Sequence, residues 1–249
     1  MKNLRYVFLV FFLSFFLLSF GQTPTTQKVS NQHQIWIRYY NKIKLSDKWS
    51  FQTELENRRF TFPDRNGQML IKSHLHRKLN DKRDVAIGLA YYSNGQSNPS
   101  STSNLFVPEW RPFQMFSVKQ KFGKSNFSHR YVLEERFKAK TKNDEVISGY
   151  KFNLRIRYRA QFDYPLINNS ENKNIVKLKI FDEILINTGN GIVMNVFDHN
   201  RFYAGLNFWL SKCFSIEAAY LHIYKQRSSG FEYYNQNNVR ITLFHNINY

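Results

Sequence analysis

The sequence predicts an all-β protein, an antiparallel up-and-down transmembrane β-barrel of about twelve strands with a polar, Arg-rich lumen; ten strands is the alternative count. Three observations lead to this fold class. Apolar and polar residues alternate in segment after segment, as on the two faces of a strand. The last such run ends at Tyr249 and resembles the closing strand of a bacterial outer-membrane barrel. Mean hydropathy is only −0.53, which excludes a bundle of membrane helices but suits strands with one lipid-facing side.

The N-terminal segment has the pattern of a secretory signal peptide. Lys2 and Arg5 precede an apolar run over residues 6–20, and the small residue Gly21 follows. The run is too short for a comfortable membrane helix, which needs about 20 apolar residues. We therefore predict a signal peptide at 1–21, cleavage before Gln22 and a barrel domain at 22–249; an uncleaved helical anchor is the alternative.

The charge balance is strongly basic and indicates anionic partners. The chain carries 36 Lys and Arg against 18 Asp and Glu, a formal net charge of +18. Candidate partners are outer-membrane lipid, lipopolysaccharide phosphates and anionic solutes, whereas export argues against nucleic acid. Cys213 is the single cysteine, which leaves no internal disulfide and no Cys-based metal site. Aromatic residues make up 17%, as interfacial girdles would require; a soluble aromatic core is the alternative.

Turn chemistry separates the alternating segments. The predicted strands are residues 33–43, 49–60, 68–79, 84–93, 112–122, 127–137, 149–163, 175–187, 200–210, 214–224 and 237–249. Short turns are expected near Ser46, Asn80, Gly123 and Ser211, and longer connections at 61–67, 94–111, 138–148, 188–199 and 225–236. The segment 164–174 is longer than its place in this alternation predicts. Short turns on one rim and long loops on the other are typical of outer-membrane barrels.

Eleven predicted strands conflict with the even numbers of bacterial single-chain barrels. A twelfth strand is sought within 104–111 or 22–32. A strand inside 94–111 would exchange the rims of the short turns and the long loops for all the strands before it. An additional N-terminal strand or a miscount is therefore preferred. The C-terminal strand, with Ile241, Leu243, Ile247 and Tyr249 on one face, is expected to close the barrel and to be recognised by the barrel-assembly machinery. Its end would lie in the periplasm.

The strand 149–163 decides which face is the lumen. Arg155, Arg157 and Arg159 share one face, and Leu154, Ile156 and Tyr158 share the other. An arginine that faces lipid at the midplane costs roughly 2–4 kcal/mol, so three outward arginines would be prohibitive. The arginines are therefore expected to face inward. Alternation alone does not exclude a soluble barrel with the opposite arrangement.

The same parity predicts a network of charges in the lumen. Its members are Glu54, Glu56, Arg58, Arg130, Glu134, Arg136, Arg155, Arg157, Arg159, Glu183, Arg201 and Glu217. Glu135 and Asp182 fall on the opposite, apolar face, and Glu135 is expected near a rim or a β-bulge. A cross-linked interior that passes nothing is favoured, because buried charges are usually paired. A narrow anion-favouring pore is the alternative, since rings of Arg and Lys select anions.

Several segments together resemble the bacterial domain-of-unknown-function family 2490. They are Gln34-Ile35-Trp36, the stretches 44–49, 54–58 and 129–137, the Arg155–Arg159 strand, Phe181-Asp182-Glu183 and the stretch 197–205. Each segment is weak alone, and their order is fairly specific. The resemblance covers nearly the whole mature chain and implies a predicted outer-membrane barrel of unassigned activity. It supplies no catalytic residues.

Catalytic signals are weak. The G-x-S-x-G, P-loop and H-E-x-x-H motifs are absent, and no cofactor or metal is predicted. His74 and His76 share a strand face, but no third metal ligand is apparent. Asp198 and His199 in a predicted outer loop are the candidate hydrolytic pair, although loop Asp and His are common. The sequence thus favours a non-enzymatic barrel, for structure, interaction or restricted anion transport. Alternatives are an outer-membrane hydrolase of lipid or envelope material and a soluble exported lipid-binding barrel.

Overall fold

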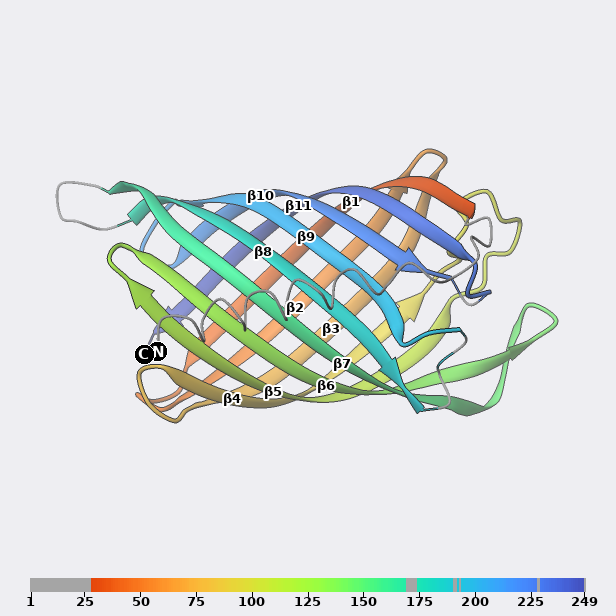
Figure 1. Ribbon diagram of the computed structural model, residues 1–249, viewed down its shortest axis with the longest axis horizontal. Helices are drawn as coiled ribbons and strands as arrows, with labels where there is room; N and C mark the ends of the chain where they lie inside the picture. Colours follow the sequence, from red (N-terminus) through yellow and green to blue (C-terminus); the bar gives the residue numbers. More distant parts are fainter. Residues whose placement is uncertain (1–27, 169–173, 190–191, 193, 228, 249) are drawn as a thin grey trace, which may run out of the picture.

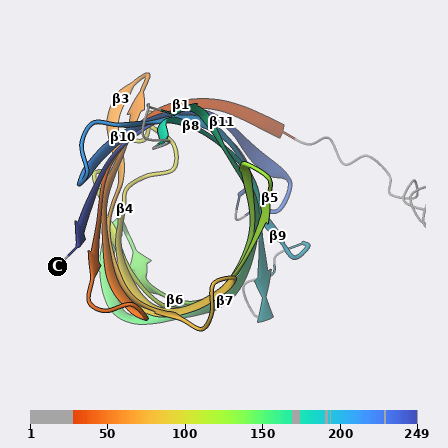
Figure 2. The same ribbon diagram turned by 90° about the vertical axis from the view of Figure 1, so that its left-hand side faces the viewer.

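In the computed structural model, the described residues 28–168, 174–189, 192, 194–227 and 229–248 form one closed β-barrel (Figure 1). Eleven strands are found in these residues, and each is hydrogen-bonded to the next in chain order. Figure 2, viewed along the barrel, shows the ring they form. The strands are β1 Lys28–Lys44, β2 Trp49–Thr61, β3 Asp64–Lys78, β4 Arg83–Asn94, β5 Val107–Phe122, β6 Ser125–Lys142, β7 Glu145–Asn168, β8 Asn174–Thr188, β9 Phe197–Trp209, β10 Phe214–Gln226 and β11 Glu232–Asn248.

All eleven predicted strands are present, but the predicted total of about twelve is wrong, as is the alternative of ten. The two segments considered for a twelfth strand instead lengthen their neighbours. Residues 107–111 are the first part of β5, and residues 28–32 are the first part of β1. Residues 22–27 and the predicted signal peptide at 1–21 lie outside the described residues, so the signal peptide stays a prediction.

The barrel closes through a parallel pair, which corrects the prediction of a purely antiparallel sheet. β1 and β11 run side by side in the same direction, from Lys28 opposite Glu232 to Lys44 opposite Asn248. An up-and-down chain with an odd number of strands must close in this way, because its first and last strands point the same way. Lys28 and Asn248 therefore lie at opposite ends of the barrel (Figure 1).

The end of the barrel where β11 finishes is named the C-terminal rim, and the end where β1 begins is the N-terminal rim. Turns 45–48, 79–82, 123–124 and 210–213 lie at the C-terminal rim, as predicted. Two connections predicted to be long at the N-terminal rim, 61–67 and 138–148, are turns of only two residues. Most of those residues extend strands, and Asn143 and Asp144 turn the β6–β7 hairpin with φ of 49° and 61°. Loop 95–106 remains long.

The two faces of the sheet differ as the arginine argument predicts. Each strand contributes an exposed apolar side chain to the outer face: Ile35, Leu55, Ile71, Ile87, Phe116, Tyr131, Ile156, Ile184, Phe202, Ile216 and Ile241. Buried charged residues occupy the inner face, with small apolar clusters such as Trp36, Phe181, Tyr203 and Leu221. No helix in the part of the chain that the structure describes is long and apolar enough to cross a membrane.

Candidate functional site: a charged layer between two cavities

Glu183 is the centre of the charged interior. Its side chain is fully buried, and Arg157 donates to both of its carboxylate oxygens at 2.9 and 2.8 Å. Arg159 donates to it at 3.2 Å, Arg130 at 3.0 Å, and Arg201 lies at 3.5 Å. Strand register explains this gathering. Arg130, Arg159, Glu183 and Arg201 are directly opposite one another across the four neighbouring strands β6, β7, β8 and β9.

Glu134 is a second shared carboxylate, two inward-facing positions further along the barrel, since its partner Arg155 and the Glu183 partner Arg159 are four residues apart on β7. It lies directly opposite Arg155 and accepts hydrogen bonds from Arg155 and Arg157. Arg155 also donates to Asp198 Oδ2 at 2.8 Å. Arg157 thus connects Glu134 to Glu183, and Arg155 connects Glu134 to β9. Because charged groups taken out of water need paired partners, these bridges are what allow so many charges to be buried.

Other carboxylates extend the network around the barrel wall. Glu109 accepts two hydrogen bonds from the guanidinium group of Arg111, at 2.8 and 2.9 Å, one on each carboxylate oxygen. It accepts a third hydrogen bond from Arg136 at 2.6 Å. Glu217 accepts hydrogen bonds from Lys179 and from the Tyr203 hydroxyl.

Aromatic rings support the guanidinium groups of the lumen. Arg58 pairs with Glu56 at 2.6 Å and lies 3.8 Å from the centre of the Trp36 ring. Arg111 is 3.6 Å from the ring of Tyr92, and Arg159 is 3.7 Å from the ring of Phe181. Stacking of this kind suits arginine, which is planar and more weakly hydrated than lysine. The rings therefore both fill space and hold positive charge.

The structure places all twelve residues of the predicted lumen network on the inner face, each in at least one ion pair. Sequence reasoning missed Arg38, Asp84, Glu109 and Arg111, whereas Lys179 falls on the predicted inner face of its strand together with Glu183. The signal for Glu109 and Arg111 was present, because they have the same inward parity as Phe113 and Met115. Pro108 and Pro112 hid it, since proline argues against an interior strand. In β5 the ladder to β6 skips Arg111 and Pro112 but keeps its register.

Glu135 and Asp182 lie on the outer face. Glu135 accepts a hydrogen bond from Gln114 at 3.3 Å, and Asp182 accepts one from Asn200 at 2.9 Å. The expectation of a bulge or a rim position at Glu135 is wrong, because the register shift of β6 falls between Ala139 and Lys140, and Glu135 pairs regularly with Leu154. A neighbouring amide on the same face supplies the partner that each carboxylate needs.

The buried charges separate two sets of cavities. A cavity of about 510 Å³ lies toward the C-terminal rim, and cavities of about 170 and 320 Å³ lie toward the N-terminal rim. The first shares no lining residue with the other two. The side chains between them, here named the ionic layer, are Glu134, Arg157, Arg159, Glu183, Tyr203 and Glu217. They line none of these three cavities and lie between the two sets.

Asp198 and His199 adjoin the N-terminal cavities. They lie in β9, not in a loop, and His199 Nδ1 is 3.1 Å from Asp198 Oδ2. His199 is buried, and neither ring nitrogen has a well-formed hydrogen bond with any residue the structure describes. Asp198 is also engaged by Arg155. The pair is close together, but the described residues supply no serine hydroxyl bonded to His199 that would act as a nucleophile.

His74 and His76 lie side by side on β3, with ring centres 4.7 Å apart. His74 Nε2 is 3.0 Å from Gln52 Oε1, and His76 Nδ1 is 3.6 Å from Asp84. Within the described ranges, no three His, Cys, Asp or Glu side chains are grouped as a metal site would require. The two histidines are therefore part of the polar lining of the C-terminal cavity.

Fold and interior together define a class of protein: a closed β-barrel with an apolar exterior and a lumen filled by paired charges. Residues 33–235 match the family described as protein of unknown function DUF2490, and the chain belongs to that family. The match confirms the resemblance found in the sequence. No curated protein matches the chain significantly.

Proposed function

We propose that this protein is an outer-membrane β-barrel with a structural or interaction role, whose lumen is closed at mid-height. The observation that carries the proposal is the orientation of β7. Arg155 and Arg157 are buried inside the barrel, whereas Ile156 between them is 40% exposed on the outside. Hydrocarbon around the barrel would stabilise that outer face, and the opposite orientation would place several guanidinium groups in lipid at roughly 2–4 kcal/mol each.

The soluble lipid-carrier alternative fits the interior poorly. Such a carrier needs an apolar cavity for acyl chains. The interior cavities here are lined mainly by Lys, Arg, Glu, Asp and amide side chains. An apolar exterior in water would moreover leave a large unburied patch around the whole molecule. Both arguments favour a lipid environment on the outside.

Partners follow from this placement. The outer face would contact outer-membrane lipid, and the basic rims would contact lipopolysaccharide phosphates. Before closure, β11 presents an unpaired edge, and strand addition to that edge would let the barrel-assembly machinery recognise it. Ile241 and Leu243 point outward from β11, and Ile247 shares their parity. Tyr249 lies outside the described residues.

Fractionation tests the location. We expect the protein in the detergent-extracted outer membrane, with a gel mobility that changes on heating as a folded barrel denatures. Recovery in the soluble periplasmic fraction, with no heat-dependent mobility, would contradict the proposal.

Restricted anion transport is the second candidate, because both sides of the ionic layer are basic. The C-terminal cavity is lined by eight Lys and Arg against four Asp and Glu, and the 170 Å³ cavity by seven against two. Planar-bilayer recording separates the candidates. A closed layer predicts no steady current from the purified barrel. Sustained current with a reversal potential that favours anions would instead establish transport, and neutral replacements of Arg155, Arg157 and Arg159 should then abolish the preference.

A further inference from the structure

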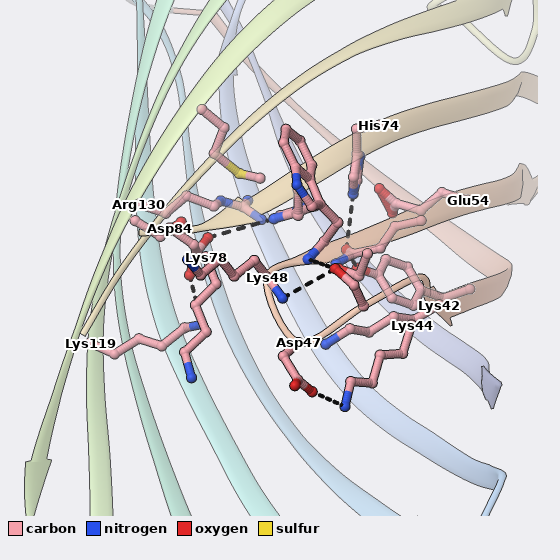
Figure 3. A pocket seen from close by; sticks show the side chains of 18 of the residues that line it. Lys42, Lys44, Asp47, Lys48, Glu54, His74, Lys78, Asp84, Lys119 and Arg130 are labelled. Carbon is pink, nitrogen blue, oxygen red and sulfur yellow. Dashed lines mark hydrogen bonds and ion pairs between the residues drawn. The ribbon is translucent and has the colours of Figure 1, made fainter. Parts of the chain in front are cut away.

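The cavity toward the C-terminal rim collects positive charge from several strands. Arg38, Lys42 and Lys44 alternate along the inner face of β1, Lys72 and Lys78 come from β3, and Lys119 comes from β5. Turn 45–48 forms part of its mouth (Figure 3). Period-2 alternation at the ends of neighbouring strands thus brings these cations around one volume of about 510 Å³.

The carboxylates of this cavity are already engaged. Glu54 is shared by Arg38 at 3.0 Å and Lys72 at 3.5 Å. Asp84 contacts Lys119 at 2.7 Å. At the rim, Asp47 pairs with Lys44 and Asp81 with Lys78, each at 2.7 Å.

Lys42 and Lys48 make no ion pair with any residue that the structure describes. Both line the cavity, and Figure 3 shows them among the other labelled cations. With eight cations and four carboxylates, the lining carries an excess of four positive charges. Like charges confined in a cavity with low-dielectric walls raise the local concentration of counter-ions, so the cavity favours an anion with several charges.

We propose that this cavity binds a small polyanion with two or more phosphate groups. Lysine ammonium groups bind phosphate oxygens as point charges, and the volume is within the usual range for small-molecule sites, about 300–1,000 Å³. The Gln52 amide and the Ser117 hydroxyl line the same space and could add neutral donors, while the Tyr40 hydroxyl donates to Gln52 Oε1 and helps to orient that amide. The inference rests on the closed barrel and holds whether or not the barrel sits in a membrane.

The phosphate groups have two potential sources, a soluble compound or lipid headgroups at the rim. Two lipid environments distinguish them. In nanodiscs of zwitterionic lipid, a soluble anion binds without competition. If lipid headgroups occupy the site, the unmodified barrel should bind the soluble anion more weakly in nanodiscs of anionic phospholipid than in nanodiscs of zwitterionic lipid. The affinity of a Lys42→Gln variant should then be the same in both lipids. If the unmodified barrel binds the soluble anion equally well in both lipids, the site is assigned to soluble anions.

Isothermal titration of the detergent-purified barrel with inorganic pyrophosphate tests the proposal. The variant is K42Q/K48Q, which removes the two lysines without leaving a carboxylate unpaired. The matched control is K82Q/K212Q, two exposed lysines in turns of the same rim that do not line the cavity. We expect saturable one-to-one binding, about ten-fold weaker in K42Q/K48Q and unchanged in the control.

Two results would overturn the proposal: no heat of binding in the unmodified barrel, or the same loss of affinity in both variants, which would mean nonspecific attraction to a basic rim. Heat-dependent gel mobility shows that each variant is folded. Because the titration is performed in detergent, its outcome is independent of the fractionation that tests the outer-membrane proposal.

Discussion

Arg157 and Glu183 are joined by two hydrogen bonds, at 2.9 and 2.8 Å, from neighbouring strands at the centre of the barrel. They are diagonal neighbours, because the residue directly opposite Glu183 on β7 is Arg159. Glu183 therefore accepts hydrogen bonds both from Arg159, directly opposite it, and from Arg157, the next inward-facing residue on β7. Together with Arg130 and Arg201, four guanidinium groups contact this one carboxylate, and of the four Arg157 also pairs with Glu134.

Replacing this carboxylate should destabilise the barrel severely. Glu183→Gln keeps the size of the side chain but leaves four arginines without their shared counter-charge. Loss of one partner from a buried ion pair costs about 3–5 kcal/mol, and we expect that range in the free energy of unfolding, measured by urea denaturation in lipid vesicles. Glu135→Gln on the outer face is the matched control, with an expected change below about 0.5 kcal/mol. Equal effects of the two substitutions would contradict the role of Glu183.

Parallel closure can be tested by cross-linking. Ile35 lies opposite Val239, and Ile43 lies opposite Ile247. In a Cys213→Ser background, cysteine pairs 35/239 and 43/247 should both react with a short bifunctional thiol reagent. The pair 35/247 joins opposite ends of the two strands and should not react. A twelfth strand between β1 and β11 would abolish both expected cross-links. Antiparallel pairing of β1 with β11 would leave at most one of the two cysteine pairs close enough to react.

The same closure places the two ends of the described barrel at opposite rims, so in the proposed outer-membrane placement they would lie on opposite sides of the membrane. An epitope inserted before Lys28 lies at the N-terminal rim, and one inserted in turn 123–124 lies at the C-terminal rim. If β11 ends in the periplasm, antibody should reach the first epitope on intact cells and the second only after permeabilisation. Detection of both epitopes on intact cells would refute an odd number of spanning strands.

Period-2 alternation was sufficient to locate the strands and the inner face. It succeeded most clearly at Arg155, Arg157 and Arg159, where the cost of placing charge in lipid leaves one orientation. It fails at segment ends, because alternation alone does not tell whether residues 107–111 form a separate strand or, as in the structure, the start of β5. The preference for an even strand number reflects the usual closure of bacterial barrels and not a local property of any residue.

Parity predicted twelve members of the charged site and missed others such as Glu109 and Arg111, and it did not predict which charges pair. Parity assigns Glu183 and Arg201 to the lumen, whereas their being opposite one another depends on the register of β8 against β9. A shift of one residue would exchange the two faces, and a shift of two would keep every charge inside with different partners. The position of Asp198 within β9, in contact with Arg155, depends on the same register and on a register shift between Leu185 and Ile186.

Site-specific labelling along β7 tests the orientation of the barrel most directly. In the Cys213→Ser background, single cysteines replace Ile156 or Phe162, whose side chains are 40% and 37% exposed on the outer face, or Asn153 or Gln161, which line the interior cavities. The neutral inner positions avoid disturbing the ionic layer. A thiol reagent confined to the hydrocarbon of the bilayer should label positions 156 and 162 and spare 153 and 161. Labelling of 153 and 161 with protection of 156 and 162 would show that the oily face is turned inward, and would refute an outer-membrane barrel with a charged lumen.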